Sequence, residues 1–438
     1  LVNLSNSKWS YRNPEDNLVV GFDLGAIMDK RRLDFNFTWN MSLFNRDIWD
    51  GSMSLEEMDV ALDDSVDGII GRQYDENGII TQDGLVETAD MAGPLEALGD
   101  LIIVNTNMTP LVPIDVINYD DHPIATIVNM PSAAFNFRLA GNYTLSKFIV
   151  EYRQVGPEFV SLGNPFLASN IREFILLNRI THLFDSKLLI TTGFKHRDNK
   201  ILETVVNPLN TNTITLNLSF LPGAGAPSFV FNFQSISKDN EKEDLDKVGE
   251  SDVDNRQDTR TKNVLLSINY PITFRSIKHN FVLNYNSMIN TDKLAGQRMV
   301  GYFFPGSDSK SVTLSLASRF QSPLRTMLNV SLMDLFIPSL DYEGNVIKNT
   351  ITWKTLGVNG KYALQDNKIN LTGGLSYIKN ESLTTVSSVI GLRGGADYKL
   401  LQDFSLSFSG QLQIIVNETA KETKLNTSGI LISFRYNF

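Results

Sequence analysis

The chain has 438 residues, no cysteine and a formal net charge of −10. The lack of cysteine excludes thiolate catalysis, cysteine-ligated zinc, iron–sulfur clusters and any disulfide framework. No apolar run approaches the ~20 residues of a membrane-spanning helix, and the acidic balance disfavours nucleic acid as a partner.

The chain begins at Leu1 without an initiator methionine, so we expect that processing or truncation has removed the true start. The first predicted strands cover 18–28 and 32–44 and join at a tight turn, Asp29 to Arg31. In the second strand, apolar residues from Leu33 to Met41 alternate with Asp, Asn and Thr. Successive strand side chains point to opposite faces, so this pattern predicts one apolar and one polar face.

A long acidic insertion, residues 46–131, follows the second strand. It carries eighteen acidic and two basic residues, 2 − 18 = −16, so the rest of the chain sums to −10 + 16 = +6. Ser54 and Glu57 have the spacing of a capping box and predict a short helix through about Leu62. The apolar stretches 101–104 and 111–114 indicate further folded parts.

The insertion has two interpretations. It is either a lid or constriction that narrows a pore and biases it towards cations, or an acidic surface cap without a gating role. Its carboxylates, and those between Asp239 and Asp258, are calcium ligands by type. Neither stretch has the spacing of an EF-hand loop, and solvated acidic loops need no ion, so we predict no metal site.

Beyond the insertion a hairpin unit recurs along the chain. Strands of roughly ten to fourteen residues end in an aromatic residue, a short turn follows, and a second strand returns to a longer polar loop. The predicted strands after 46–131 are 133–143, 145–154, 172–183, 187–197, 211–220, 228–237, 261–270, 277–288, 310–320, 324–336, 349–362, 368–379, 385–399, 403–417 and 425–438. The aromatic residues at the turn end are Tyr143, Phe184, Phe220, Tyr270, Phe320, Tyr362, Tyr398 and Phe438.

These strands predict an all-β, transmembrane, antiparallel up-and-down β-barrel of about 18 strands, with short periplasmic turns and long external loops. A soluble β-sandwich or a β-solenoid also has alternating strands, but the strands of globular sheets are usually shorter. Seventeen strands are predicted, whereas bacterial single-chain barrels normally have an even number. The eighteenth is expected either at Val2 to Tyr11 or upstream of Leu1. We expect residues 1–438 to form one barrel domain.

Charged residues on the polar face are the candidate selectivity residues of the lumen. They are Glu151, Arg153, Arg179, Lys195, Arg197 and Arg393. Rings of charge set selectivity in pores, although charged side chains in wide barrels also pair simply to fill the lumen. The loop from Val155 to Leu167, with two prolines and two glycines, is predicted to be compact and to fold over the mouth or rest on the insertion.

No catalytic arrangement is found in the sequence. His122, His182, His196 and His279 are scattered, and no Gly-x-Ser-x-Gly turn or phosphate-binding glycine loop occurs. We therefore predict that the chain is not an enzyme and uses no cofactor.

The hairpin repeat, the aromatic strand ends and the terminal Phe438 resemble the outer-membrane β-barrels of bacteria. Within that class the chain resembles porins and the barrel portion of TonB-dependent receptors. The resemblance implies a place in the bacterial outer membrane, contact with its lipid, and passage of small solutes. The alternative is a structural, adhesive or secretion-associated barrel whose external loops bind a partner. A periplasmic or surface protein is the kind of protein partner that we expect.

Overall fold

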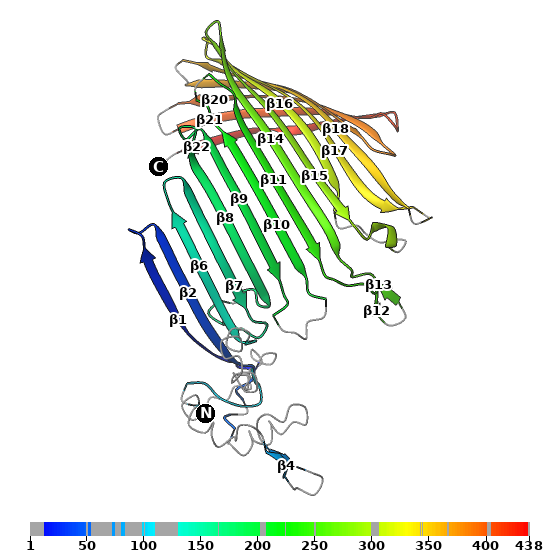
Figure 1. Ribbon diagram of the computed structural model, residues 1–438. Coiled ribbons are helices and arrows are strands. Elements are labelled where there is room, and N and C mark those ends of the chain that lie inside the picture. The colour runs from blue at the N-terminus through cyan, green and yellow to red at the C-terminus, as the bar shows by residue number, and fades with distance from the viewer. Residues whose placement is uncertain are drawn as a thin grey trace. The chain divides into compact units, whose positions relative to one another are not determined.

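The structure is a computed structural model that describes residues 13–49, 51–53, 72–74, 80–83, 99, 101–109, 130–164, 166–201, 207–223, 225–248, 251–298, 306–341, 343, 345–365, 368–400 and 404–436. These residues form twenty-two strands and one 3-10 turn, Ala295–Gln297 (Figure 1). Among them, no helix has the length and apolar character needed to cross a membrane.

Seventeen of the strands are long, with ten to nineteen residues each. They are β1 (Asp16–Met28), β2 (Leu33–Asn45), β6 (Ala133–Asn142), β7 (Ser146–Val155), β8 (Ile171–Leu183), β9 (Leu188–Asp198), β10 (Asn210–Phe220), β11 (Ser228–Asp239), β14 (Asp258–Phe274), β15 (Ile277–Asp292), β16 (Asp308–Arg319), β17 (Leu324–Leu340), β18 (Val346–Leu364), β19 (Ile369–Glu381), β20 (Val386–Lys399), β21 (Phe404–Asn417) and β22 (Glu422–Tyr436). Each overlaps one of the predicted strands, so the all-β class is confirmed.

One sheet contains eighteen strands, the seventeen long ones and the two-residue β5 (Met108–Thr109). The pairs β1–β2, β2–β6 and β11–β14, and each successive pair from β14 to β22, are antiparallel. The described strands do not close this sheet into a barrel. The predicted strand from Val2 to Tyr11 lies outside the described residues, and closure therefore stays a prediction.

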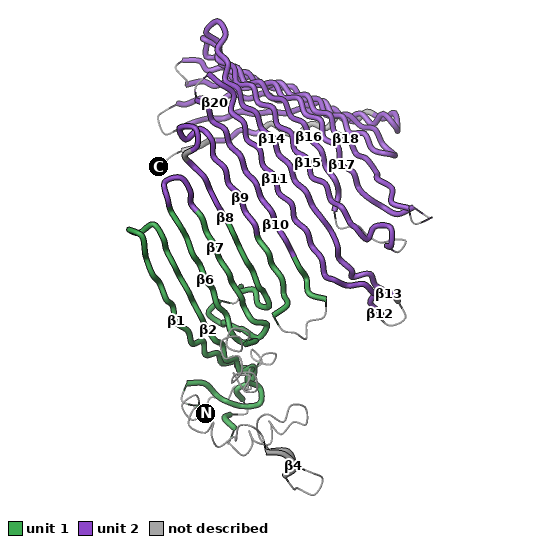
Figure 2. Tube along the Cα trace, viewed as in Figure 1, with its two compact units in different colours: residues 1–142, 148–176, 195–210 green, residues 143–147, 177–194, 211–438 purple. Residues whose placement is uncertain are grey.

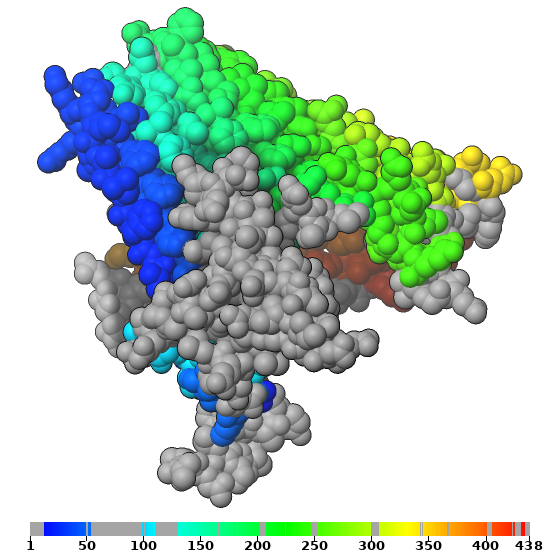
Figure 3. Space-filling view, turned by 60° about the horizontal axis from the view of Figure 1, so that its bottom comes forward, coloured from blue at the N-terminus to red at the C-terminus, as the bar shows by residue number. Residues whose placement is uncertain are grey.

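The chain divides into two compact units (Figure 2). Unit 1 contains 1–142, 148–176 and 195–210, and unit 2 contains 143–147, 177–194 and 211–438. The expectation of one barrel domain over 1–438 stays a prediction. Figure 3 shows one face of the molecule, on which the residues of β11 to β17 in unit 2 run in colour from green to yellow.

The register in unit 2 keeps polar and apolar side chains on separate faces. Leu328 pairs with Val358, Val358 with Leu375, and Leu375 with Leu392, which makes an apolar row across four strands. One residue further along each strand, the paired positions belong to the opposite, polar face, because strand side chains alternate. We refer to these as the apolar face and the polar face.

Left-handed backbone forms two of the tight turns of unit 2. Phe184, Asp185 and Ser186 have φ of 50°, 55° and 63°, and Arg275 and Ser276 have φ of 47° and 71°. Two-residue hairpins favour such conformations because their twist matches that of the flanking strands. The tight turn predicted at Asp185 is confirmed. We call this end of the strands the turn edge and the opposite end the loop edge.

Several strands are longer than predicted, and two of them continue past a proline. β14 continues past Pro271, which pairs with Asn280, and β17 continues past Pro338, which pairs with Lys348. Proline lacks an N–H group and is usually found at strand edges, so the predicted strands ended at 270 and 336. β18, predicted over 349–362, spans Val346–Leu364 and pairs with the extended part of β17.

Unit 1 has a small core where part of the insertion covers β2. Leu43, Ile102, Val104 and Met108 are buried, and Leu101 is exposed. The Asn45 side chain donates hydrogen bonds to the Ile103 carbonyl at 2.6 Å and to Asn105 Oδ1 at 3.0 Å. The expected folding of 101–104 is confirmed in this part. The stretch 111–114 and the helix expected over 54–62 lie outside the described residues.

The loop after β7 is compact and packs within unit 1. Phe159 is buried with Ala134 and Val155. The Val160 carbonyl accepts a hydrogen bond from Asn17 Nδ2 at 3.1 Å and another from Ser42 Oγ. These contacts place the loop on β1 and β2. The prediction of a packed loop is confirmed for its described residues.

Candidate functional site

Three of the predicted selectivity residues converge on a single carboxylate in unit 1. Glu173 is almost fully buried, with 4% of its side chain exposed. Arg153 Nη2 lies 2.7 Å from it, Lys195 Nζ 2.9 Å and Arg197 Nε 3.8 Å. The three cations are partly exposed and their charge is partly balanced by Glu173. This cluster joins β7, β8 and β9, and a selectivity role for its three cations stays a prediction.

Glu151 faces a weaker partner. Its carboxylate lies 3.9 Å from Arg138 Nε, and both side chains are partly exposed. A pair of this kind contributes little to stability. Arg179 lies in β8, in the part that belongs to unit 2. A selectivity role for these residues stays a prediction.

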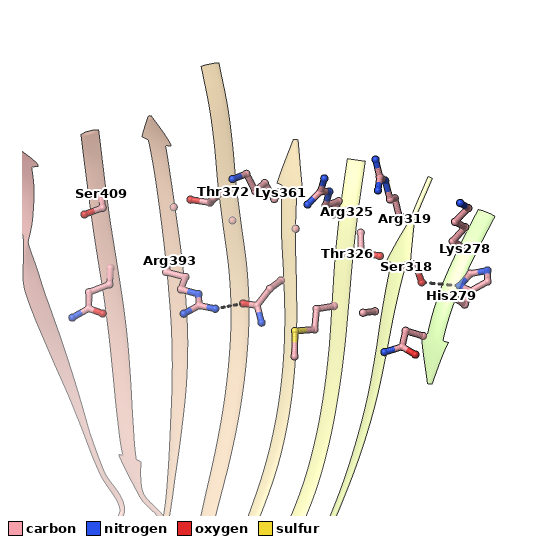
Figure 4. A pocket seen from close by; sticks show the side chains of 18 of the residues that line it. Lys278, His279, Ser318, Arg319, Arg325, Thr326, Lys361, Thr372, Arg393 and Ser409 are labelled. Carbon is pink, nitrogen blue, oxygen red and sulfur yellow. Dashed lines mark hydrogen bonds between the residues drawn. The ribbon is translucent and has the colours of Figure 1, made fainter. Parts of the chain in front are cut away.

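Arg393 is the predicted residue that lies in a cavity. Its guanidinium donates a hydrogen bond to Asn359 Oδ1 on β18, two strands away (Figure 4). The cavity has a volume of about 990 Å³ and lies within unit 2, against residues of β14 to β22. Cavities of this volume are in the range of small-molecule sites.

Four more cations line the cavity. The strand register pairs Lys278 with Arg319, Arg319 with Arg325, and Arg325 with Lys361. We call these four residues the cationic row. Each of β15, β16, β17 and β18 contributes one member, so the charges lie side by side across four neighbouring strands (Figure 4). All four side chains are exposed.

The cationic row is costly for the sheet. Directly paired residues have Cβ atoms about 4.5–5.5 Å apart, and like charges at such positions destabilise a sheet. None of the four has a carboxylate within ion-pair distance among the described residues, and the residues that line the cavity include no Asp or Glu. The row therefore contrasts with the Glu173 cluster, where the carboxylate partly balances the cations.

The cationic row continues into neutral polar groups. Lys361 pairs with Thr372, Thr372 with Gly395, and Gly395 with Ser409. On the same face, Gln411 and Asn280 also line the cavity. The Thr372 hydroxyl donates a hydrogen bond to the Gly395 carbonyl at 3.4 Å, and the Ser409 hydroxyl and the amides of Gln411 and Asn280 are further donor groups. The wall as a whole therefore combines positive charge with neutral donor groups.

Sequence reasoning missed the cationic row. Its four members are separated by 41, 6 and 36 positions, and only the pairing register brings them together. A signal was present, because each cation lies on a polar register within a few residues of a turn. Arg393, in the middle of β20, was predicted from its position on the polar face alone.

A second charged cluster lies at the loop edge of unit 2. Arg298 is fully buried and donates to Asp292 at 2.8 and 3.1 Å, and its Nη1 lies 2.9 Å from Asp254 Oδ1. Arg256 also binds Asp254, with Nε at 3.0 Å. Burial raises the pKa of Asp254, but hydrogen bonds from Arg256 and Arg298 outweigh it and lower the pKa to about 2. We call these four residues the loop clamp.

The acidic run from Asp239 to Asp258 supplies Asp254 to this clamp, and other carboxylates of the run form separate ion pairs. Asp246 pairs with Lys242, and Asp258 with Lys293. Within the described ranges, no group of three or more His, Asp or Glu side chains is arranged to hold a metal ion. The acidic residues of the insertion between Asp63 and Glu76 lie outside the described residues.

No family model matches the chain, and no curated protein matches it. Among solved structures, it is similar to the alcaligin outer membrane receptor FauA from Bordetella pertussis, with 12% identity, a TM-score of 0.31, and coverage of 69% of this chain and 62% of that one. The FpvAI–pyocin S2 complex matches with 9% identity, a TM-score of 0.35, and coverage of 97% and 58%. The chain thus spans about three fifths of these two proteins.

A third similar structure is an anion-selective porin from Comamonas acidovorans. The identity is 12% and the TM-score 0.27, and the match covers 69% of this chain and 93% of the porin chain.

Proposed function

We propose that the chain forms a β-barrel in the bacterial outer membrane that passes small solutes across it. The observation that carries this proposal is the exposed apolar face of unit 2. Val358, Leu375 and Leu392 form one cross-strand row and are 45%, 53% and 55% exposed. Contiguous apolar surface of this kind needs a nonpolar environment, and lipid supplies one over the whole height of a strand.

Strand length supports a membrane rather than a soluble sheet. The long strands have ten to nineteen residues, whereas strands in globular proteins have about five or six. A tilted membrane strand needs roughly 9–11 residues. The polar face would then enclose a water-filled lumen, and the cavity beside the cationic row would open into it.

Planar bilayers test this proposal directly. Purified protein is expected to give discrete conductance steps, because a water-filled lumen conducts ions. The same measurement on a variant lacking residues 46–131 separates a closed lid from a barrel without a pore. A protein that stays silent in both forms would refute solute passage.

A further inference from the structure

We propose that the cationic row, together with Arg393, is an oxyanion-binding site that makes the lumen selective for small solutes with carboxylate or phosphate groups. This inference rests on the proposed function only in that the polar face lines a lumen. It names the solute class, which the sequence did not predict. The acidic insertion had instead suggested a bias towards cations.

The arrangement of charge is the first argument. Around Glu173 in unit 1, a buried carboxylate partly balances three cations, whereas Lys278, Arg319, Arg325 and Lys361 lie side by side with no carboxylate of the described residues within ion-pair distance. Four adjacent like charges cost stability and gain nothing from each other. An anion at the row would relieve this repulsion.

The spacing indicates what kind of anion fits. Neighbouring members of the row lie on adjacent strands, which are about 4.7–4.9 Å apart. A solute with two or three carboxylate or phosphate groups can therefore contact several members at once. Arginine binds such groups through two parallel N–H donors, and the row contains Arg319 and Arg325.

The rest of the cavity wall suits the same ligand. Thr372 and Ser409 continue the row with hydroxyl groups, and Gln411 adds an amide. Arg393 extends from β20 into the same cavity and is held by Asn359 (Figure 4). The wall therefore offers charge at one side and neutral donors at the other.

Calorimetry can measure the binding of tripolyphosphate to the purified protein in detergent. This measurement tests the site without requiring a pore. The Arg319→Gln/Arg325→Gln/Lys361→Gln variant is expected to bind at least about tenfold more weakly, because charge-assisted hydrogen bonds are lost. Arg275→Gln is the matched control. Arg275 is also exposed at the turn edge, but it lies over the Phe274 ring, 5.4 Å from its centroid, outside the row. The affinity of the Arg275→Gln variant for tripolyphosphate is expected to stay within about twofold of the wild-type value.

The triple glutamine variant is expected to fold, since it removes like-charge repulsion, and its heat-modifiable mobility on gels checks this. If a folded triple variant binds tripolyphosphate as well as wild type, or if wild type does not bind it, the site is refuted. An equal loss in Arg275→Gln would also refute it, because general surface charge would then account for binding.

Ion selectivity in bilayers provides the second measurement. Wild type is expected to have a chloride-to-potassium permeability ratio above one, and Arg319→Glu/Arg325→Glu/Lys361→Glu is expected to bring it below one, because charged rings set selectivity. A conducting wild type that prefers potassium, or an unchanged ratio in the variant, would refute the inference. A silent protein that still binds tripolyphosphate through the row would refute solute passage and support the site.

Discussion

The loop clamp offers the sharpest stability prediction. Arg298 has no exposed side-chain surface, and its partners Asp254 and Asp292 are 4% and 6% exposed. Arg298 Nη1 also donates to the Arg256 carbonyl at 3.0 Å. Through these contacts Arg298 joins the segment before β14 to the one after β15. Arg298→Met removes the charge and keeps most of the volume, so it leaves two buried carboxylates without their shared cation.

The expected cost is about 3 kcal/mol. Breaking a buried ion pair typically costs about 3–5 kcal/mol, because a buried charge remains uncompensated. The lower end applies here, since Asp254 keeps Arg256 and the Asp292 carboxylate still accepts the Leu294 N–H at 3.0 Å. Adding Asp292→Asn to Arg298→Met removes one stranded charge and is expected to recover part of the loss.

The backbone N–H groups of Leu294 and Arg256 donate hydrogen bonds to the clamp carboxylates Asp292 and Asp254. Hydrogen exchange at these two amides therefore measures the loss of stability locally. A loss of about 3 kcal/mol accelerates exchange by roughly 100-fold if the segment opens locally. The control is Lys293→Met, because the Lys293–Asp258 pair is exposed and worth at most about 1 kcal/mol. If both variants exchange at similar rates, the clamp does not hold these loops.

Three further predictions concern other parts of the chain. The pKa of Asp254 is lowered to about 2, so its contribution to stability is complete above the unfolded pKa of about 3.9 and is lost as the pH falls through 2. Pepsin should therefore cleave residues 240–257 faster at pH 2 than at pH 4, relative to its cleavage of an unfolded substrate, and equal relative rates would contradict this. Glu173→Gln should lower the free energy of unfolding by about 1–3 kcal/mol, because three cations lose their shared carboxylate. Glu151→Gln should lower it by at most about 1 kcal/mol, because its ion pair with Arg138 is long and partly exposed. Gly156→Ala should destabilise its loop by about 1–3 kcal/mol, seen as faster proteolysis, because a Cβ there would overlap the Pro131 carbonyl; unchanged proteolysis would show that the loop can shift.

The alternation of side chains made the strands predictable. Leu33, Phe35 and Phe37 on one face with polar residues on the other indicate a strand whatever its neighbours are, because the period of two is a local property. All seventeen long strands were found in this way. Two of the differences in their bounds lie at Pro271 and Pro338, where pairing with a neighbouring strand continues past a residue that usually ends one.

Residues that depend on long-range pairing were not predictable in the same way. Arg153, Lys195 and Arg197 were expected to act as selectivity residues, and the structure places them around Glu173, which the sequence did not single out. In β22 a register shift opposite Ser409 and Gln411 interrupts the alternation that the sequence suggested through 425–438. A bulge of this kind adds a residue to one strand only and leaves no clear local signal.

The sequence by itself determined that the chain is all β, where its strands run, and which face of each strand is polar, because these properties depend on neighbouring residues. Only the tertiary structure decided which charges meet. Lys278 and Arg319 are 41 positions apart, and a shift of one residue in the register would move either of them to the apolar face. The cationic row exists because four strands keep their registers together.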